Sequence, residues 1–449
     1  MMEACGGTES ALNNTGRWTF AVRALRHRNY RLFFGGQSIS LIGTWMTRIA
    51  TVWLVFRLSH SAMLLGVVGF AGQIPTLLLA PFAGVWVDRL NRHRVLVATQ
   101  VLSMVQSFWL AALALTGTIT VADIIWLSAF QGLINAFDMP GRQAFVIEMI
   151  EDRADLANAI AINSSMVNLA RLVGPSIAGL LIAAVGEGYI FLIDGVSYLA
   201  VIASLLMMSL GVRPPLPARS GMLQELRAGW SYVAGLLPIR ALLLLLGLAS
   251  LMGMPYTVLM PIFAGTILHG GPSALGFLMG ASGVGALAAA IALAARRTVI
   301  GLGRLVAISA AIFGGGLIAF SASRLLWLSL LMMFLVGYGM MQQMAASNTI
   351  LQTIVEEEKR GRVMSYYTMA VVGMAPLGSL LAGWLAARLG APAALLISGI
   401  AVVIGAGWFA LLLPALRRVT RPLYAQLGII SELASGVQAA SALTTPPQD

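Results

Sequence analysis

Residues 84–94 read "GVWVDRLNRHR", which places one aspartate and three arginines at the end of an apolar run that begins near Ser61. Such a concentration of charge is unusual in this chain, because only 10% of its 449 residues are charged and 59% are hydrophobic. Soluble domains are typically about 45–50% apolar. The composition therefore predicts an integral membrane protein in which this charged stretch lies outside the hydrocarbon core.

The spacing of the apolar runs predicts the number of membrane spans. A helix needs about 20 predominantly apolar residues to cross a hydrocarbon core of about 30 Å. Runs of that kind are centred near residues 43, 73, 106, 132, 172, 200, 252, 285, 312, 336, 374 and 402. We therefore expect an all-α membrane protein of about twelve transmembrane helices, with residues 84–94 between the second and the third.

The basic residues indicate the orientation of the spans. With the N-terminus inside, one face carries Arg17, Arg23, Arg26, Arg28, Arg89 to Arg94, Arg142, Arg153, Arg213, Arg219, Arg227, Arg296, Arg297, Lys359 to Arg362, Arg417, Arg418 and Arg421. The other face receives little beyond Arg57, Arg324 and Arg388. Cytoplasmic loops carry the excess of Lys and Arg, so both termini are expected in the cytoplasm. The arginines are dispersed without interleaved aromatics, so nucleic acid is not an expected partner.

The chain also contains an internal repeat. Residues 142–186 align without gaps on residues 346–390 after a shift of 204 positions, and three glycines of the first segment fall on glycines of the second: Gly174, Gly179 and Gly186 on Gly378, Gly383 and Gly390. The alternative is that helices rich in Gly, Ala and Leu resemble each other by composition alone. The repeat predicts two pseudo-symmetric six-helix bundles with a binding site at their interface.

We divide the chain accordingly. The predicted parts are residues 1–28 (cytoplasmic N-terminal segment), 29–212 (N-terminal six-helix bundle), 213–238 (cytoplasmic linker), 239–416 (C-terminal six-helix bundle) and 417–449 (cytoplasmic tail).

The opening stretch resembles the signature of the loop between the second and third spans in the major facilitator superfamily, Gly-x-x-x-Asp-(Arg/Lys)-x-Gly-(Arg/Lys)-(Arg/Lys). Gly84, Asp88, Arg89 and Arg92 match it, and Asn91 stands at its second glycine. Asn tolerates a left-handed turn better than other non-glycine residues, so that conformation is expected at Asn91. The resemblance implies the major facilitator fold.

The resemblance also implies that this loop takes part in a latch between the two halves. Asp88 would accept hydrogen bonds from arginines and from N–H groups at the start of the eleventh span, near residues 362–366. The predicted cytoplasmic latch comprises Gly84, Asp88, Arg89, Arg92, Arg142, Glu151, Arg153 and Arg362. The alternative is a loop whose arginines set the topology and have no switching role.

Longer stretches narrow the resemblance to one branch of the superfamily. The segments "NAFDMPGRQAFV" (135–146), "NAIAINSSMVNLARLVGPSIAG" (158–179) and "IDGVSYLA" (193–200) are similar to the branch of bacterial enterobactin exporters and macrolide-efflux proteins. This resemblance implies a multi-pass protein of the bacterial inner membrane that exports small molecules. It says little about the cargo.

Polar residues at helical spacing predict which faces are turned away from lipid. Polar side chains are costly against lipid, so such stripes should line a wet cavity or a helix contact. The predicted cavity residues are Gln37, Arg48, Gln131, Asn135, Asn168, Arg171, Tyr338 and Gln342. Interhelical hydrogen bonding is the alternative role for such residues.

Few charges lie within the spans. Arg48 and Asp194 lie at similar depth and are able to pair. Arg171 has no carboxylate at its level, so it binds an anionic part of the cargo or is satisfied by water and carbonyl groups. Asp138 and Asp194 are the carboxylates within spans that could carry a coupling proton, although each has an arginine nearby.

These features together predict a secondary transporter. The sequence contains no Walker loop and no catalytic or metal-ligand spacing within a span, so neither an enzyme nor a cofactor is expected. We expect an exporter of an amphiphilic small molecule, siderophore or drug-like, that works by alternating access with proton antiport, contacts membrane lipids and is a monomer. The alternatives are a lysolipid or lipid flippase with an apolar cavity, suggested by Met252, Met254, Met260, Met340, Met341 and Met344, and a transporter-like sensor or partner protein.

Overall fold

The computed structural model describes residues 23–150, 152–208, 231–296 and 298–426. Helices form almost all of this part of the chain, and eleven helical segments are long and apolar enough to cross a membrane. A twelfth, α5 (Val121–Glu148), packs against its neighbours α3 (Ala62–Arg89) and α4 (Arg92–Leu115) but is more polar. The expected twelve spans are therefore all present as helices.

The other long helices of the first half follow the predicted runs, and two short 3-10 helices precede α2 and α6. They are η1 (Arg23–Arg26), α2 (Arg28–Ser59), η2 (Arg153–Asp155), α6 (Leu156–Val185) and α7 (Glu187–Leu206). Polar side chains cap the helices that follow two short connections. Ser61 Oγ accepts from Leu64 N at 3.3 Å at the start of α3, and Thr120 and Asp123 form a reciprocal capping box at the start of α5. Such caps satisfy N–H groups that the first turn of a helix leaves free.

The charged stretch at 84–94 contains a helix break that differs from our expectation. Asn91 is not left-handed: its φ is −69° and its ψ is 106°. Its side-chain oxygen instead accepts from Arg94 N at 3.2 Å and caps α4. Because Asn is among the best N-cap residues, this position begins a helix and does not need the conformational freedom of glycine.

The second half is less regular. Its helices are α9 (Leu237–Leu248), α10 (Tyr256–Ile262), α11 (Gly271–Ala294), α12 (Leu302–Ala322), α13 (Leu326–Ile354), α14 (Glu357–Thr368), α15 (Met374–Leu389) and α16 (Ala391–Gln426). Wide π turns interrupt the seventh span at η3 (Ala249–Gly253) and η4 (Phe263–Ile267) and the eleventh at η5 (Met369–Gly373). Such turns are rare and occur frequently at functional sites.

The predicted repeat has a structural counterpart in its glycines. Gly186 and Gly390 end α6 and α15 with φ values of 85° and 86°. A Cβ at Gly179 would lie 2.7 Å from Gly276 Cα, and one at Gly383 would lie 2.8 Å from Gly66 Cα, so both mark a close approach between the two halves. Equivalent positions thus perform equivalent roles, which composition alone would not produce.

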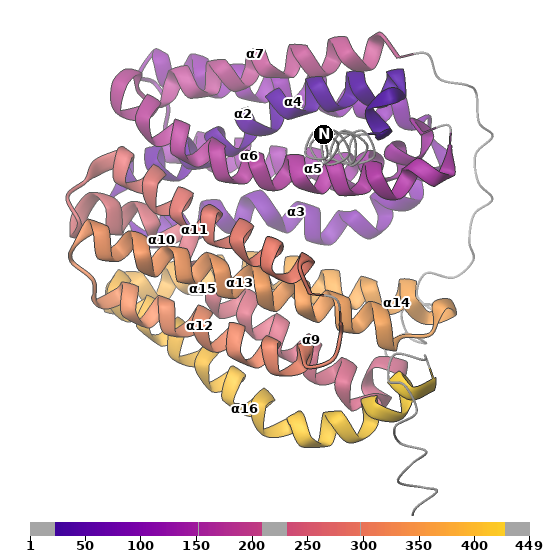
Figure 1. Cartoon of the computed structure of the whole chain (residues 1–449). Helices are drawn as coiled ribbons and strands as arrows, with labels where there is room; N and C mark the ends of the chain where they lie inside the picture. Colours follow the sequence, from indigo (N-terminus) through magenta and orange to yellow (C-terminus); the bar gives the residue numbers. More distant parts are fainter. Residues whose placement is uncertain (1–22, 151, 209–230, 297, 427–449) are drawn as a thin grey trace, which may run out of the picture.

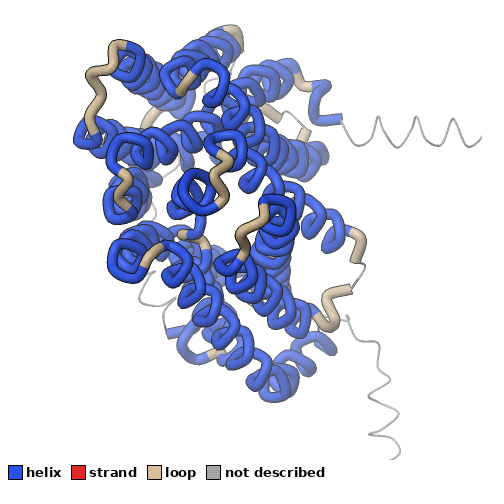
Figure 2. Tube along the Cα trace, turned by 90° about the vertical axis from the view of Figure 1, so that its left-hand side faces the viewer, coloured by secondary structure: helices blue, strands red, loops and turns tan. Residues whose placement is uncertain are grey.

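The two halves form two helix groups, one above the other in Figure 1. We call the end at which α2 begins and α16 ends the chain-end face, on the right of Figure 1, and the other end the opposite face. The extensive contacts across the halves are α6 with α11 and α3 with α15. Figure 2 looks onto the opposite face, where short loops join the helices.

The apolar core is continuous between the halves only near the opposite face, within the described residues. One cluster there unites buried residues of both halves, such as Leu54 and Phe191 with Phe263 and Leu395. Towards the chain-end face each half has its own cluster: one around Tyr30 and its neighbours, the other around Ile239 and its neighbours. The halves are therefore packed together at one end of the molecule and separately cored at the other.

Candidate functional site

A buried carboxylate with a full set of partners lies in the first half. Asp138 on α5 is 4% exposed. Its Oδ1 accepts from Thr99 Oγ1 at 3.0 Å and from Gln100 Nε2 at 2.7 Å, and its Oδ2 forms an ion pair with Arg142 one turn further along α5. Because buried charges persist when paired and hydrogen-bonded, this cluster fixes α4 against α5.

Asp194 on α7 has a different environment. It is 1% exposed, and its Oδ2 accepts at 2.9 Å from Thr47 Oγ1 of α2 and at 2.9 Å from Ser107 Oγ of α4. Its Oδ1 has no hydrogen-bond partner, since α2 packs closely there at Gly43. No ion pair of the described residues involves Asp194, so only neutral hydroxyl groups bind this buried carboxyl group.

A stripe of polar side chains on α4 runs between the two carboxyl groups. It consists of Thr99, Gln100, Ser103, Gln106 and Ser107, all of which are buried. Ser103 accepts from Gln131 Nε2 of α5 at 3.2 Å. This stripe was not among the predicted polar faces, although its spacing of three and four residues is the same signal that identified the stripes of other spans.

Two arginines meet at one tryptophan of α2. Arg48 lies over the Trp45 ring with its Cζ 4.9 Å from the ring centroid, and the Cζ of Arg171 on α6 lies 5.7 Å from the same centroid. The ion pair that we considered possible between Arg48 and Asp194 is not formed. Asp194 turns to Thr47 and Ser107, while the guanidinium of Arg48 is attracted to the aromatic ring.

The other predicted cavity residues divide into two groups. Gln37 and Gln342 are each 2% exposed, so the packed interior encloses them and they line no open cavity in this conformation. Four residues are accessible or partly so: Gln131, Asn135, Asn168 and Tyr338. Gln131 Nε2 donates to Asn135 Oδ1 at 3.3 Å, and Asn168 Nδ2 donates to Ser164 O at 2.9 Å, so part of their polarity is satisfied within the helices.

The described members of the predicted latch are bound within their own halves or exposed. Arg92 Nη1 lies 2.6 Å from Glu148 Oε1 on α5, Arg142 pairs with Asp138, and Arg362 is exposed on α14. Glu148 was not among the predicted residues. The side chains of Gly84, Asp88, Arg89 and Arg153, and all of Glu151, lie outside the described residues, as do most of the predicted linker and parts of the predicted N-terminal segment and tail.

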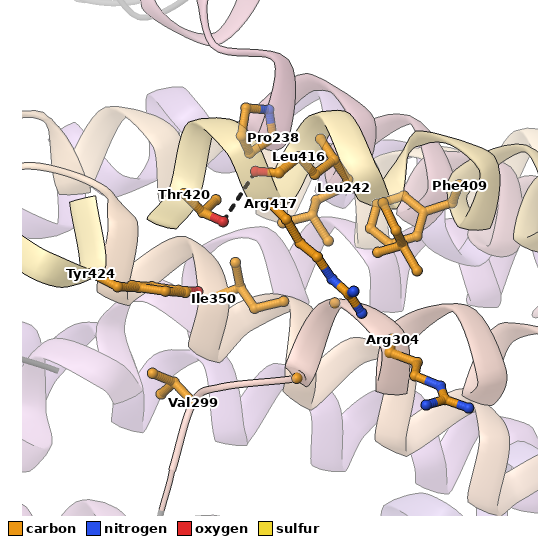
Figure 3. A pocket seen from close by; sticks show the side chains of 13 residues that line it. Pro238, Leu242, Val299, Arg304, Ile350, Phe409, Leu416, Arg417, Thr420 and Tyr424 are labelled. Carbon is orange, nitrogen blue, oxygen red and sulfur yellow. Dashed lines mark hydrogen bonds between the residues drawn. The ribbon is translucent and has the colours of Figure 1, made fainter. Parts of the chain in front are cut away.

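A small cavity in the second half lies apart from this site. Side chains of α9, α12, α13 and α16 surround it near the chain-end face, among them Arg304, Arg417, Phe409 and Tyr424 (Figure 3). Its volume is about 80 Å³, whereas sites for drug-sized ligands have roughly 300–1,000 Å³. This cavity is therefore too small in the present conformation to hold such a cargo.

Five of the six methionines behind the flippase alternative lie in the apolar core or pack against it. Met260 and Met340 are buried, and Met252, Met254 and Met344 pack against the same core. Methionine fills irregular gaps between helices well. Their packing accounts for these residues without an acyl-chain cavity.

Two six-helix halves with charged and polar groups at membrane depth define a membrane transport protein of the major facilitator type. The chain belongs to the family of this type described as "Transmembrane secretion effector", which matches residues 19–422.

Sequence similarity to three bacterial transport proteins supports this membership. The chain is 27% identical over 357 residues to the "Staphyloferrin A transporter" of Staphylococcus aureus, covering 78% of this chain and 88% of the relative. It is 30% identical over 392 residues to the "Multidrug efflux pump Tap" of Mycobacterium tuberculosis, covering 84% and 91%. It is 25% identical over 398 residues to "Macrolide efflux protein A" of Streptococcus pyogenes, covering 84% and 95%.

Solved structures share the fold at low sequence identity. A bacterial homologue of the human lysosomal transporter Spinster, solved in an inward-facing and unoccupied conformation, superposes with a TM-score of 0.67 at 14% identity and covers 86% of this chain and 96% of its own. The nucleoside transporter NupG gives a TM-score of 0.67 at 12% identity, with 86% and 99% covered. At these identities the likeness concerns the fold alone.

Proposed function

We propose that this protein exports an amphiphilic small molecule, siderophore or drug-like, across the bacterial inner membrane by alternating access coupled to proton antiport. The observation that carries the proposal is the apolar core, which is shared by the halves near the opposite face and divided near the chain-end face. Two bundles that rock about a central site alternate between a state packed together at one face and a state packed together at the other face. The efflux proteins among the relatives favour the outward direction.

The orientation of this state follows from the basic residues. In the described part of the chain, basic residues such as Arg26, Arg94 and Lys359 belong to elements at the chain-end face, which the positive-inside rule assigns to the cytoplasm. The divided core is then the inward-facing form, in which cargo enters from the cytoplasm. Within the described residues the predicted latch residue Arg142 pairs with Asp138 of its own helix, which is the arrangement expected when the cytoplasmic latch is open.

Asp194 is the proposed proton carrier. A coupling group has to exist in both protonation states, and a buried carboxyl group without a basic partner can do so because burial disfavours its charge. Asp194 satisfies this condition, whereas Asp138 is bound to Arg142. The polar stripe on α4 supplies hydroxyl and amide groups along which a proton and water could pass between Asp138 and Asp194.

The proposal is tested by retention of siderophores, macrolides and lysolipids in efflux-deficient bacteria that express the protein, with and without a protonophore. Export that the protonophore abolishes for a siderophore or a macrolide is the expected result. Export of lysolipids alone would replace the proposal with the flippase alternative. Absence of any response, at normal membrane expression, would contradict it.

The Asp194→Asn variant tests the coupling residue. It mimics the protonated form permanently, so we expect it to exchange cargo across the membrane but to lose accumulation driven by the proton gradient. Asp123→Asn is the matched control, because Asp123 caps α5 at the opposite face and lies outside the buried cluster. Gradient-driven export by Asp194→Asn at the rate of the control would contradict this role.

A further inference from the structure

Trp45 brings two positive charges together inside the membrane-spanning part. Arg48 lies eleven residues before the end of α2 at Ser59, and Arg171 lies fourteen residues before the end of α6 at Val185. At 1.5 Å per residue these positions are about 16 and 21 Å from the helix ends. The two helices are close here, since a Cβ at Gly174 would lie 2.6 Å from Trp45 Cβ.

Neither guanidinium has a counter-charge in the described part of the chain. The neighbouring carboxylates of the first half are bound elsewhere: Asp138 to Arg142, Glu148 to Arg92, Asp155 to Arg23 and Glu187 to Arg57, while Asp194 binds two hydroxyl groups. No side-chain hydrogen bond or ion pair of the described residues involves Arg48 or Arg171. Their only described partner is the Trp45 ring, which they share.

Apart from the Trp45 ring, the described side chains supply no partner to these two groups, and Arg48 is exposed while Arg171 is partly exposed. Each guanidinium carries five N–H donors in a planar fork. Charged groups at this depth are costly and mark substrate pathways unless they are paired. The two like charges also repel each other. An oxyanion placed between them would remove the repulsion and accept several hydrogen bonds, which favours its binding.

Arg171 lies next to the contact between the halves. Leu172, the residue after Arg171, packs closely against Gly283 of α11. A Cβ added at Gly283 would lie only 3.0 Å from Leu172 Cα. One turn further, Ser176 packs against Gly280. An anion on Arg171 would therefore be held beside the surface along which the halves move.

We propose that Arg48 and Arg171 bind the anionic group of the cargo, a carboxylate, sulfonate or phosphate, and that Trp45 positions both guanidiniums for it. The inference rests on the proposed function and names its substrate class, an amphiphile with an oxyanion at one end. Arginine suits this task because its fork matches carboxylate and phosphate oxygens in bidentate geometry. The cation–π contacts hold the forks in place before the cargo arrives.

Equilibrium binding to the purified protein tests the inference without any proton gradient. The probes are 1-anilinonaphthalene-8-sulfonate, an amphiphilic anion, and its uncharged parent N-phenyl-1-naphthylamine, both of which fluoresce more strongly in apolar sites. We expect the double variant R48Q/R171Q to bind the sulfonate at least tenfold more weakly than the unmodified protein and to bind the uncharged parent equally well. R48K/R171K should retain an intermediate affinity for the sulfonate, because it keeps the charge but loses the fork.

Arg388 provides the matched control. It also lies over a tryptophan, with its Cζ 5.6 Å from the Trp384 centroid, but near the opposite face at the end of α15. R388Q should leave the affinity for both probes unchanged. Unaltered sulfonate binding by R48Q/R171Q, or an equal loss for both probes, would overturn the inference. Because the assay needs no transport, its result is independent of whether export or coupling is observed in cells.

Discussion

Gly179 offers a direct test of how the two halves meet. A Cβ at this position would lie 2.6 Å from Pro272 O, 2.7 Å from Gly276 Cα and 2.9 Å from Gly276 N. All three are backbone atoms of the segment around α11, so no side chain can rotate away. We therefore expect Gly179→Ala to force α6 and α11 apart near the opposite face.

The size of the effect follows from the overlap. Overpacking of a tight contact costs about 1–3 kcal/mol, and about 1.4 kcal/mol corresponds to a factor of ten in an equilibrium. The substitution should shift the equilibrium away from the state described here by about 5- to 150-fold. It should also leave the folded protein intact, because alanine favours helix more than glycine does.

Spin labels on the opposite face measure this shift. Cys5 is the only cysteine, so a Cys5→Ser background allows labels at Thr118 in the first half and Leu325 in the second, both of which are exposed. We expect the distribution of label distances to move to longer values in Gly179→Ala. Gly407→Ala is the control, because a Cβ there would meet nothing within 4 Å. An unchanged distribution in Gly179→Ala would refute the close approach.

Two further predictions concern stability. Arg142→Gln should lower the free energy of unfolding by about 3 kcal/mol, because it leaves the buried Asp138 without its charge partner. Unfolding in sodium dodecyl sulfate, followed by circular dichroism, measures this loss. A loss below about 1 kcal/mol would show that the ion pair is not needed for stability. Gly186→Ala and Gly390→Ala should each lower the free energy of unfolding by about 1–3 kcal/mol, because φ is 85° at Gly186 and 86° at Gly390. A large difference between the two losses in the same assay would argue against the equivalence of these positions.

The sequence by itself determined the membrane class, the twelve helices, the repeat and the family. Apolar runs of about 20 residues admit few structures other than spanning helices, because every backbone polar group in lipid has to be satisfied within its own segment. The three glycine pairs could be read from the sequence because a close approach or a positive φ admits few other residues. Polar stripes could be recognised by their spacing, although the one on α4 was overlooked.

Only the tertiary structure decided which polar groups are partners. The sequence predicts that Arg48 and Asp194 lie at a similar depth in the membrane. In the structure, the rotation of α2 and α7 directs Arg48 to Trp45 and Asp194 to Thr47 and Ser107. Hydropathy reports how deep a residue lies and not the direction of its side chain towards a neighbouring helix. The division of the core at one face likewise depends on how two stable bundles are tilted, and that tilt comes from contacts between residues far apart in the chain.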